Sequence, residues 1–258
     1  MTRPQTQHIL GVGVSAINMR QALDTLAAWV SAGELHYVCV SNVHSLMECR
    51  DAVDLRRIHN QAGMVTPDGM PLVWLLRCNG HRHVSRVYGP DLLLAVLGDA
   101  ATSGLRHYFY GGADGVARKL VERLQRDFPT SRIVGAYSPP FRPHTAEEDA
   151  EVVTRINAAR PDVVWVGLGM PKQERWIAEH RGRLEATALI GIGAAFDFHS
   201  GGKRQAPRWM QRSGFEWAFR LATEPKRLWR RYLSHNPRFV YLAARELVER
   251  VHRTRNGH

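Results

Sequence analysis

The chain has little cysteine and no long apolar run. Its three cysteines, Cys39, Cys49 and Cys78, form no CxxC pair, so we expect buried, reduced thiols rather than disulfides or a zinc site. No run of 18 or more uncharged apolar residues occurs, and a bilayer-spanning helix needs about that length. The first ten residues also lack the apolar core of a signal peptide. These absences predict a cytoplasmic protein, either free or peripheral on the inner face of the cytoplasmic membrane.

Several nucleotide-binding and metal-binding motifs are missing as well. The sequence has no GxxxxGK[ST], which removes a P-loop NTPase, and no HExxH. It also has no DxD, a pattern that the triplet Asp197-Phe-His199 does not supply. Gly11-Val-Gly13 is not followed by a third glycine at the dinucleotide spacing. We therefore expect no metal ion and no cofactor.

Acidic residues are scarce in the last 58 residues, where only four of them accompany 14 lysines and arginines. This segment carries +10 of the formal net charge of +11. A basic surface of this kind suits phosphates, an anionic membrane or nucleic acid, whereas the alternative is an arginine-rich helix that is simply solvated. Aromatic residues favour the membrane because their rings suit the lipid headgroup region; those among the arginines are Trp209, Phe215, Trp217, Phe219, Trp229, Tyr232, Phe239 and Tyr241.

Short β-prone runs alternate with helical segments in the first 200 residues, which predicts an α/β fold. The expected architecture is a Rossmann-like, largely parallel sheet with helices on both faces. We predict a body over residues 1–200 and a basic helical appendage over residues 201–258, in which prolines 207, 225 and 237 break the helical pieces. The predicted strands are 36–41, 64–66, 106–110, 132–137, 162–167 and 187–192, and the predicted helices are 45–60, 72–76, 116–128, 145–159 and one that starts near Pro171.

Ligands of such sheets bind beyond the carboxyl ends of the strands, and one carboxylate lies in that position. Asp68, in Thr66-Pro-Asp-Gly69, follows a predicted strand directly. A lone Asp before Gly is commonly a turn former or a helix cap. Its place at the sheet edge favours a second interpretation, a general base facing a cleft.

Other residues on these loops are candidates for binding a substrate. Gly111 and Gly112 offer amides to a phosphate, although a tight strand-to-helix turn explains them equally well. Gln173 and Glu174 begin a helix after a strand, where they suit a sugar hydroxyl or phosphate but also serve as first-turn caps. Asn42 and His44 lie on the loop after the first predicted strand, although a lone His is more often structural than catalytic. The full set is Asn42, His44, Gly69, Gly111, Gly112, Gly169, Gln173, Glu174 and Asp197.

Four arginines of the appendage form a further candidate site. Arg220, Arg227, Arg230 and Arg231 follow one another at spacings of seven, three and one. Most of them share one helical face if the break at Pro225 is mild. Guanidinium groups bind phosphate oxygens in pairs, so this cluster predicts a diphosphate site.

In order along the chain, these stretches resemble the WecG/TagA/CpsF family of bacterial glycosyltransferases. No single stretch is diagnostic, but the ordered set is specific. The matching stretches are Ser41-Asn-Val-His44, Thr66-Pro-Asp-Gly69, Val87-Tyr-Gly-Pro-Asp91, Phe109-Tyr-Gly-Gly112, Gly167-Leu-Gly-Met-Pro-Lys-Gln-Glu174, Gly191-Ile-Gly-Ala-Ala-Phe-Asp197, Gly201 through Pro207, Gly214-Phe-Glu-Trp217 and Glu224-Pro-Lys-Arg-Leu228.

The resemblance implies an inverting, metal-independent sugar transfer. The donor would be a UDP-sugar carrying N-acetylmannosamine, its uronic acid or glucose, and the acceptor a polyprenyl-diphosphate-linked saccharide at the cytoplasmic membrane face. It also implies that Asp68 is the base, that Gln173 lies near the sugar and that the appendage closes over the site and touches the membrane. One departure is Val40, where teichoic-acid members of the family have a Thr whose role does not carry over.

Two other classes compete with this interpretation. A sequence pI near 10.2 and arginines mixed with aromatics also suit a nucleic-acid-binding protein. Against that class, the chain has no helix-turn-helix, zinc-finger or RNP signature, and we expect no nucleic-acid partner. A non-catalytic, lipid-binding scaffold with the same fold is the third possibility, which the presence of Asp68 and Gln173 disfavours.

Overall fold

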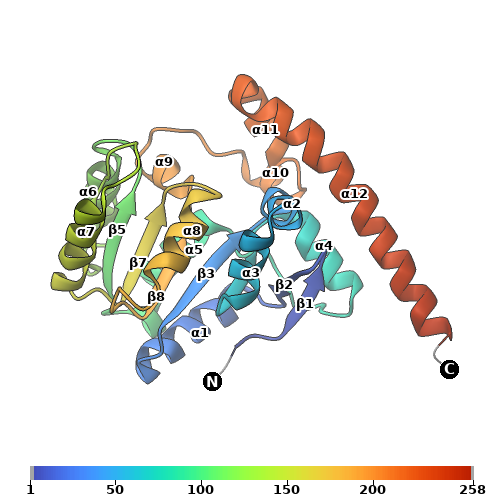
Figure 1. Ribbon diagram of the computed structural model, residues 1–258, viewed down its shortest axis with the longest axis horizontal. Coiled ribbons are helices and arrows are strands. Elements are labelled where there is room, and N and C mark those ends of the chain that lie inside the picture. Colours follow the sequence, from blue (N-terminus) through green and yellow to red (C-terminus); the bar gives the residue numbers. More distant parts are fainter. Residues whose placement is uncertain (1–2, 257–258) are drawn as a thin grey trace.

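Six parallel strands form the central sheet of the computed structural model, which describes residues 3–256 except the side chains of 251 and 253–256 (Figure 1). The order across the sheet is β4-β3-β8-β7-β5-β6, and β1 and β2 form a separate antiparallel hairpin beside β4, where Val65 N donates to Ser15 Oγ at 3.0 Å. This arrangement confirms the predicted α/β fold. The strands are β1 (Thr6–Ile9), β2 (Val12–Ser15), β3 (His36–Ser41), β4 (Met64–Pro67), β5 (Arg106–Gly111), β6 (Arg132–Tyr137), β7 (Val163–Gly167) and β8 (Ala188–Gly191).

Both faces of the sheet are covered, because successive strand residues point to opposite sides. In β7, Val164 and Val166 enter one apolar core while Val163 and Trp165 enter the other. The first core contains residues of α2 (Val43–Asp51), α3 (Val53–Gln61), α4 (Met70–Cys78), α7 (Ala146–Ala158) and α8 (Lys172–His180). The second contains residues of α1 (Met19–Ala32), α5 (Gly89–Gly98), α6 (Val116–Asp127) and α9 (Ala195–His199), with the short η1 (Ala100–Thr102) beside α1 and α5.

The appendage consists of three helices that follow α9. They are α10 (Arg208–Arg212), α11 (Glu216–Thr223) and the long α12 (Pro225–Asn256). Figure 1 shows α12 running alone along the side of the molecule that carries α2 and α4. Its buried residues Leu228, Phe239 and Ala243 mark the side that packs on the body. The boundary near residue 200 stays a prediction. Between residues 3 and 256, no helix is both long and apolar enough to cross a membrane.

Three local predictions were wrong. The single helix expected over 45–60 is two helices, because Ala52 adopts an extended backbone between α2 and α3. Pro237 does not end a helix but lies inside α12. Burial of Phe239 and Ala243 just beyond it favours continuation of the helix over a break. Cys78 is exposed, whereas Cys39 and Cys49 are buried free thiols as expected.

Pro225 behaves as predicted, since α11 ends before it. The proline is the first residue of α12, a position where its missing N–H costs nothing. Glu224 separates the two helices.

Candidate active site

A cavity of about 1650 Å³ opens at the carboxyl edge of the sheet. The residues that follow β3, β4, β5, β7 and β8 line one side of it, as expected for a parallel sheet. Residues of α11 and α12 line the other side. The cavity therefore lies between the body and the appendage, and both contribute side chains to it.

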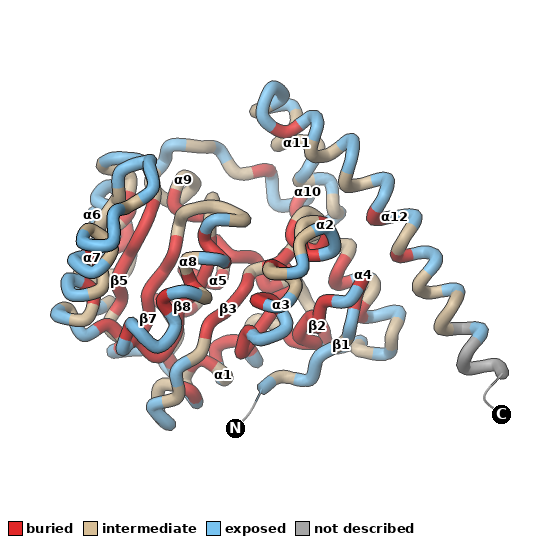
Figure 2. The backbone as a smooth tube through the Cα atoms, viewed as in Figure 1, coloured by how far each residue is buried: buried red, intermediate tan, exposed pale blue. Residues whose placement is uncertain are grey.

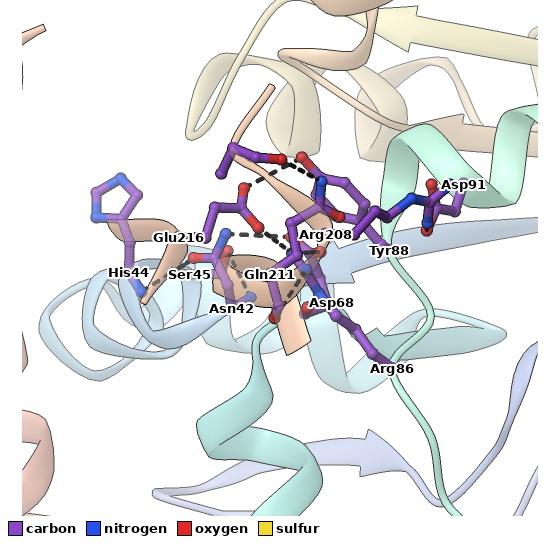
Figure 3. Close-up of polar contacts among 11 residues, drawn as sticks. Asn42, His44, Ser45, Asp68, Arg86, Tyr88, Asp91, Arg208, Gln211 and Glu216 are labelled. Carbon is purple, nitrogen blue, oxygen red and sulfur yellow. Dashed lines mark hydrogen bonds and ion pairs between the residues drawn. The ribbon is translucent and has the colours of Figure 1, made fainter. Parts of the chain in front are cut away.

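Asp68 lies at the end of β4 and lines this cavity, with only 8% of its surface exposed. Asn42 caps α2: its Oδ1 accepts from the backbone N–H of His44 at 3.0 Å. This cap leaves the Nδ2 of Asn42 to donate to Asp68 Oδ2 at 3.3 Å (Figure 3). A Cβ on Gly69 would lie 3.3 Å from that of Asn42, so the glycine lets the two loops pack closely. Asp68 is thus held in position by the neighbouring strand end.

The burial of Asp68 changes its acidity. Burial raises the pKa of the Asp68 carboxyl to about 6, Glu216 adds to the rise, and Arg86 opposes it. The carboxylate is therefore ionised at neutral pH but far more basic than an exposed aspartate. A general base works best with a pKa near the working pH, so this environment suits proton abstraction.

Arg86, Tyr88 and Glu216 surround the carboxylate, and none of them was predicted as a site residue. Arg86 Nη2 lies 3.4 Å from Asp68 Oδ1 and 2.5 Å from Glu216 Oε2 (Figure 3). The hydroxyl of Tyr88 donates to Glu216 Oε1 at 3.1 Å. Because Glu216 belongs to α11, the appendage reaches the candidate base through Arg86. Tyr88 and Glu216 fall within two of the stretches that resemble the family. That resemblance could have identified them as site residues.

Gln173 and Glu174 form a buried pair at the start of α8. Gln173 Nε2 donates to Glu174 Oε1 at 2.9 Å, and both residues line the cavity. Within the described part of the chain, Gln173 Oε1 and Glu174 Oε2 are buried without a hydrogen-bond partner. Burial raises the pKa of Glu174 to about 7. Unpaired buried acceptors are costly, and their presence beside a cavity favours a ligand that donates hydrogen bonds.

Three of the four predicted arginines point to the cavity. Arg220 of α11 and Arg227 and Arg231 of α12 line it, but Arg230 is exposed outside it. The Nε atoms of Arg220 and Arg231 are buried and have no hydrogen-bond partner among residues 3–256. Burial lowers the pKa of Arg231 to about 10, so it remains a cation at neutral pH. Arg227 pairs with Glu224 at 2.6 Å.

The exposed position of Arg230 corrects the prediction, made from spacing along the chain, that Arg230 belongs to the same site as the other three arginines. Neighbouring residues of a helix lie about 100° apart around its axis. Arg231 consequently faces the cavity while Arg230 turns to the outside, where its guanidinium lies 5.2 Å from the ring centre of Trp229.

The remaining candidates are distributed around the cavity. His44, Gly69, Gly112, Gly169 and Asp197 line it, whereas Gly111 does not. The amide of Gly112 already donates to the Gly167 carbonyl at 2.9 Å, and a Cβ on Gly111 would lie 2.6 Å from the Gly167 backbone. These two glycines therefore allow the close approach of β5 and β7, and their binding of a phosphate stays a prediction. Asp197 pairs with Lys203 at 2.9 Å, a cation that was not predicted.

The site thus combines one basic carboxylate with a group of cations on the facing helices. Such a pair suits a reaction in which a hydroxyl loses a proton while negative charge develops on a leaving phosphate. Among the described residues, one group of three side chains, His44, Glu48 and His235, could hold a metal ion.

Comparison with known proteins places these features in a family. The sequence pattern of the Glycosyl transferase WecG/TagA/CpsF family matches residues 7–253. A protein of Bacillus spizizenii, named N-acetylglucosaminyldiphosphoundecaprenol N-acetyl-beta-D-mannosaminyltransferase, is 37% identical over 70% of this chain and 68% of its own length. Proteins of the same name from Bacillus subtilis and Staphylococcus aureus are 30% and 25% identical, over 84% and 92% of this chain and 86% and 91% of their own lengths. The chain belongs to the WecG/TagA/CpsF family and is a glycosyltransferase.

Proposed function

We propose that this glycosyltransferase moves a sugar from a UDP-sugar to a polyprenyl-diphosphate-linked saccharide, in the synthesis of a bacterial cell-surface polysaccharide. N-acetylmannosamine is the first candidate sugar, and diphosphoundecaprenol-linked N-acetylglucosamine the first candidate acceptor, because the relatives carry those names. The observation that carries the proposal is the buried carboxylate of Asp68, which shares a cavity with Arg220, Arg227 and Arg231.

Asp68 acts as the general base in this proposal. It takes the proton of the acceptor hydroxyl while the hydroxyl oxygen attacks the anomeric carbon of the donor. The bond from that carbon to the diphosphate breaks as the new bond forms, so the configuration inverts. The raised pKa, about 6, supports this role because the carboxylate is both ionised and basic at neutral pH.

The arginines stabilise the departing UDP. Negative charge grows on the diphosphate as the bond breaks, and guanidinium groups stabilise such charge through paired hydrogen bonds. The unpaired Nε atoms of Arg220 and Arg231 support this assignment. With cations of the chain in this position, the transfer needs no metal ion.

Contact with a membrane is the second part of the proposal. Trp229, Leu233, Val240 and Val248 are between 46% and 66% exposed on α12. Their spacings of four, seven and eight put them on one side of the helix, and Figure 2 shows the exposed positions along it. An apolar stripe flanked by arginines suits the headgroup region of an anionic bilayer. We infer a peripheral protein on the cytoplasmic face, where a lipid-linked acceptor is accessible.

A UDP-release assay tests the activity. The full chain is given a panel of UDP-sugars with a short-chain lipid-diphosphate N-acetylglucosamine acceptor. We expect release of UDP with one donor of the panel, only when the acceptor is present. Acceptor-independent release, or none with any donor, contradicts the proposal.

The same assay with a chelator tests the metal-free chemistry. We expect Mg²⁺ or Mn²⁺ to give no increase in kcat at saturating donor after treatment with EDTA. A loss of kcat that Mg²⁺ or Mn²⁺ restores contradicts transfer without a metal ion.

A further inference from the structure

Three side chains with metal-binding atoms meet where α12 crosses α2. The Nδ1 atoms of His44 and His235 lie 3.0 Å apart. Glu48 Oε1 lies 3.7 Å from His44 Nδ1 and 3.9 Å from His235 Nε2. One donor atom from each side chain lies within 4.8 Å of the other two. The cluster thus gathers two imidazoles and a carboxylate from two helices that are remote in the sequence.

We propose that His44, Glu48 and His235 bind a divalent transition-metal ion such as Zn²⁺, and that this ion fastens α12 to α2. Imidazole and carboxylate are ordinary zinc ligands, at about 2.0–2.2 Å from the ion. At such bond lengths, tetrahedral ligand atoms lie about 3.4 Å apart. The observed separations of 3.0 and 3.7 Å lie on either side of that value. Three protein ligands leave one position for water.

The two helices arrange these ligands before any ion arrives. His44 and Glu48 are one turn apart on α2 and so share a face. His235 approaches from α12, whose Arg238 holds Asp51 of α2 through two hydrogen bonds of 2.6 and 2.7 Å. The ligands therefore need little rearrangement to surround an ion.

The charges around the cluster decide which ions it accepts. Three arginines, Arg220, Arg231 and Arg238, lie near the rings and oppose a cation, while Glu48 and Asp51 favour one. The opposing arginines disfavour ions held by charge alone, such as Mg²⁺, and leave ions that bind imidazole strongly. The side chains are 13–31% exposed, which leaves an entry path.

The position of His235 gives the ion a structural consequence. It lies one turn beyond Arg231, the buried cation of the cavity. An ion that fixes His235 against α2 also fixes the part of α12 that carries Arg231. The site would hold the appendage in the position seen here, and it takes no part in the chemistry at Asp68.

Direct metal binding tests the proposal without any assay of activity. The full chain, freed of metal by chelation, is titrated with Zn²⁺ in a calorimeter and with Co²⁺ in a spectrophotometer. We expect one equivalent of each ion, with a visible Co²⁺ spectrum typical of low coordination number. His235→Asn and Glu48→Gln should weaken binding by about tenfold or more, since even changes behind the ligands cost that much.

The matched control is His252→Asn, an exposed histidine on the same helix. It should bind Zn²⁺ as the parent chain does. Unchanged binding by His235→Asn, or no binding by the parent chain, overturns the proposal. Thermal unfolding without metal checks that each variant is folded. If His235→Asn is not folded, Glu48→Gln takes its place in the comparison with the parent chain.

Limited digestion with trypsin tests the fastening of α12, whose arginines are cleavage sites. Zn²⁺ should slow cleavage within α12 in the parent chain and in His252→Asn, but not in His235→Asn. If bound Zn²⁺ leaves the cleavage rate of the parent chain unchanged, the ion does not fasten the helix.

Discussion

At the scale of single residues, the environment of Asp68 ties function to stability. Its pKa of about 6 in the folded chain exceeds the ordinary aspartate value of 3.8. A fold that contains an acid with a raised folded pKa loses stability as pH rises from the unfolded pKa to the folded pKa, and the full cost is present above the folded pKa, because the ionised form is less favourable when buried. Arg86 and Asn42 reduce this cost but do not remove it. In the proposed mechanism, this cost in stability keeps a basic carboxylate at the place of proton transfer.

The cost predicts a stabilising but inactivating substitution. Asp68→Asn should raise the free energy of unfolding at pH 8 by about 3 kcal/mol, since about two pKa units are involved at about 1.4 kcal/mol each. The gain should fall by about half at pH 5 and vanish below about pH 3, where the aspartate is protonated in both states. Urea unfolding of the parent chain and of Asp68→Asn at several pH values measures this gain in the free energy of unfolding. A gain that grows as pH falls contradicts the assigned pKa.

The same pKa predicts how transfer depends on pH. The base must be ionised to accept a proton, so kcat/KM should decline tenfold per pH unit below about pH 6. Initial rates of UDP release from pH 4.5 to 8 give the profile. A rate that stays constant down to pH 4.5 is incompatible with Asp68 as the base.

Gln173 offers a second test at this scale. Its unpaired, buried Oε1 lies beside the cavity, where a hydroxyl or amide of the sugar could donate to it. Gln173→Ala should lower kcat/KM for the donor by about tenfold, the equivalent of one hydrogen bond of about 1.4 kcal/mol. Unchanged kcat/KM with every donor would place the sugar elsewhere.

At the scale of elements, the helical geometry of α12 points two neighbouring arginines in different directions. Arg231 faces the cavity and Arg230 the outside. Arg231→Ala should weaken the binding of UDP by about 10–100-fold, because hydrogen bonds to charged groups contribute about 1.5–3 kcal/mol. Arg230→Ala is the matched control and should bind UDP normally. Calorimetric titration with UDP compares them, and equal losses in both variants would contradict the orientation of α12.

The six strands of the parallel sheet were predictable, because they depend on local patterns, whereas the hairpin of β1 and β2 was not predicted. The β-branched run at Val163–Gly167 and the polar turns after each strand predicted a parallel sheet. Asp68 and Gln173 both follow predicted strands, and the carboxyl ends of parallel strands share one edge, so both residues were expected at that edge, where the structure has them. The pair of Arg86 and Glu216 was not predictable, since 130 residues separate its members. Pro237 within α12 was missed because packing of the helix on the body outweighs the local signal.

At the scale of the whole molecule, charge and apolar surface gather on one appendage. The last 58 residues carry +10 of the net charge of +11, and the exposed stripe of α12 lies among these cations. In the proposed function, attraction of arginines to anionic lipid would bring the chain to a bilayer, and insertion of the stripe would hold it there. Val240 of the stripe also lines the cavity, so a lipid-linked acceptor would enter the cavity from the membrane surface.

Vesicle binding tests this arrangement. Leu233→Ser combined with Val248→Ser, two exposed stripe residues outside the cavity, should lower affinity for vesicles containing anionic lipid by at least about tenfold, since each buried side chain contributes about 1.5–3 kcal/mol. The control is Val134→Ser on β6, an exposed valine at the opposite edge of the sheet from β4. Equal binding by all three proteins contradicts insertion of α12, and tighter binding to an oligonucleotide than to vesicles favours the nucleic-acid alternative.

The most direct test of the whole account is the turnover of Asp68→Asn. The exposed Asp114→Asn, on the loop after β5, is its matched control. With the donor and acceptor that support transfer by the parent chain, Asp68→Asn should lose at least about a thousandfold in kcat, within the range of general-base catalysis, while still binding UDP and unfolding cooperatively. Asp114→Asn should keep its rate. Near-normal transfer by a folded Asp68→Asn protein would show that the carboxylate is not the base.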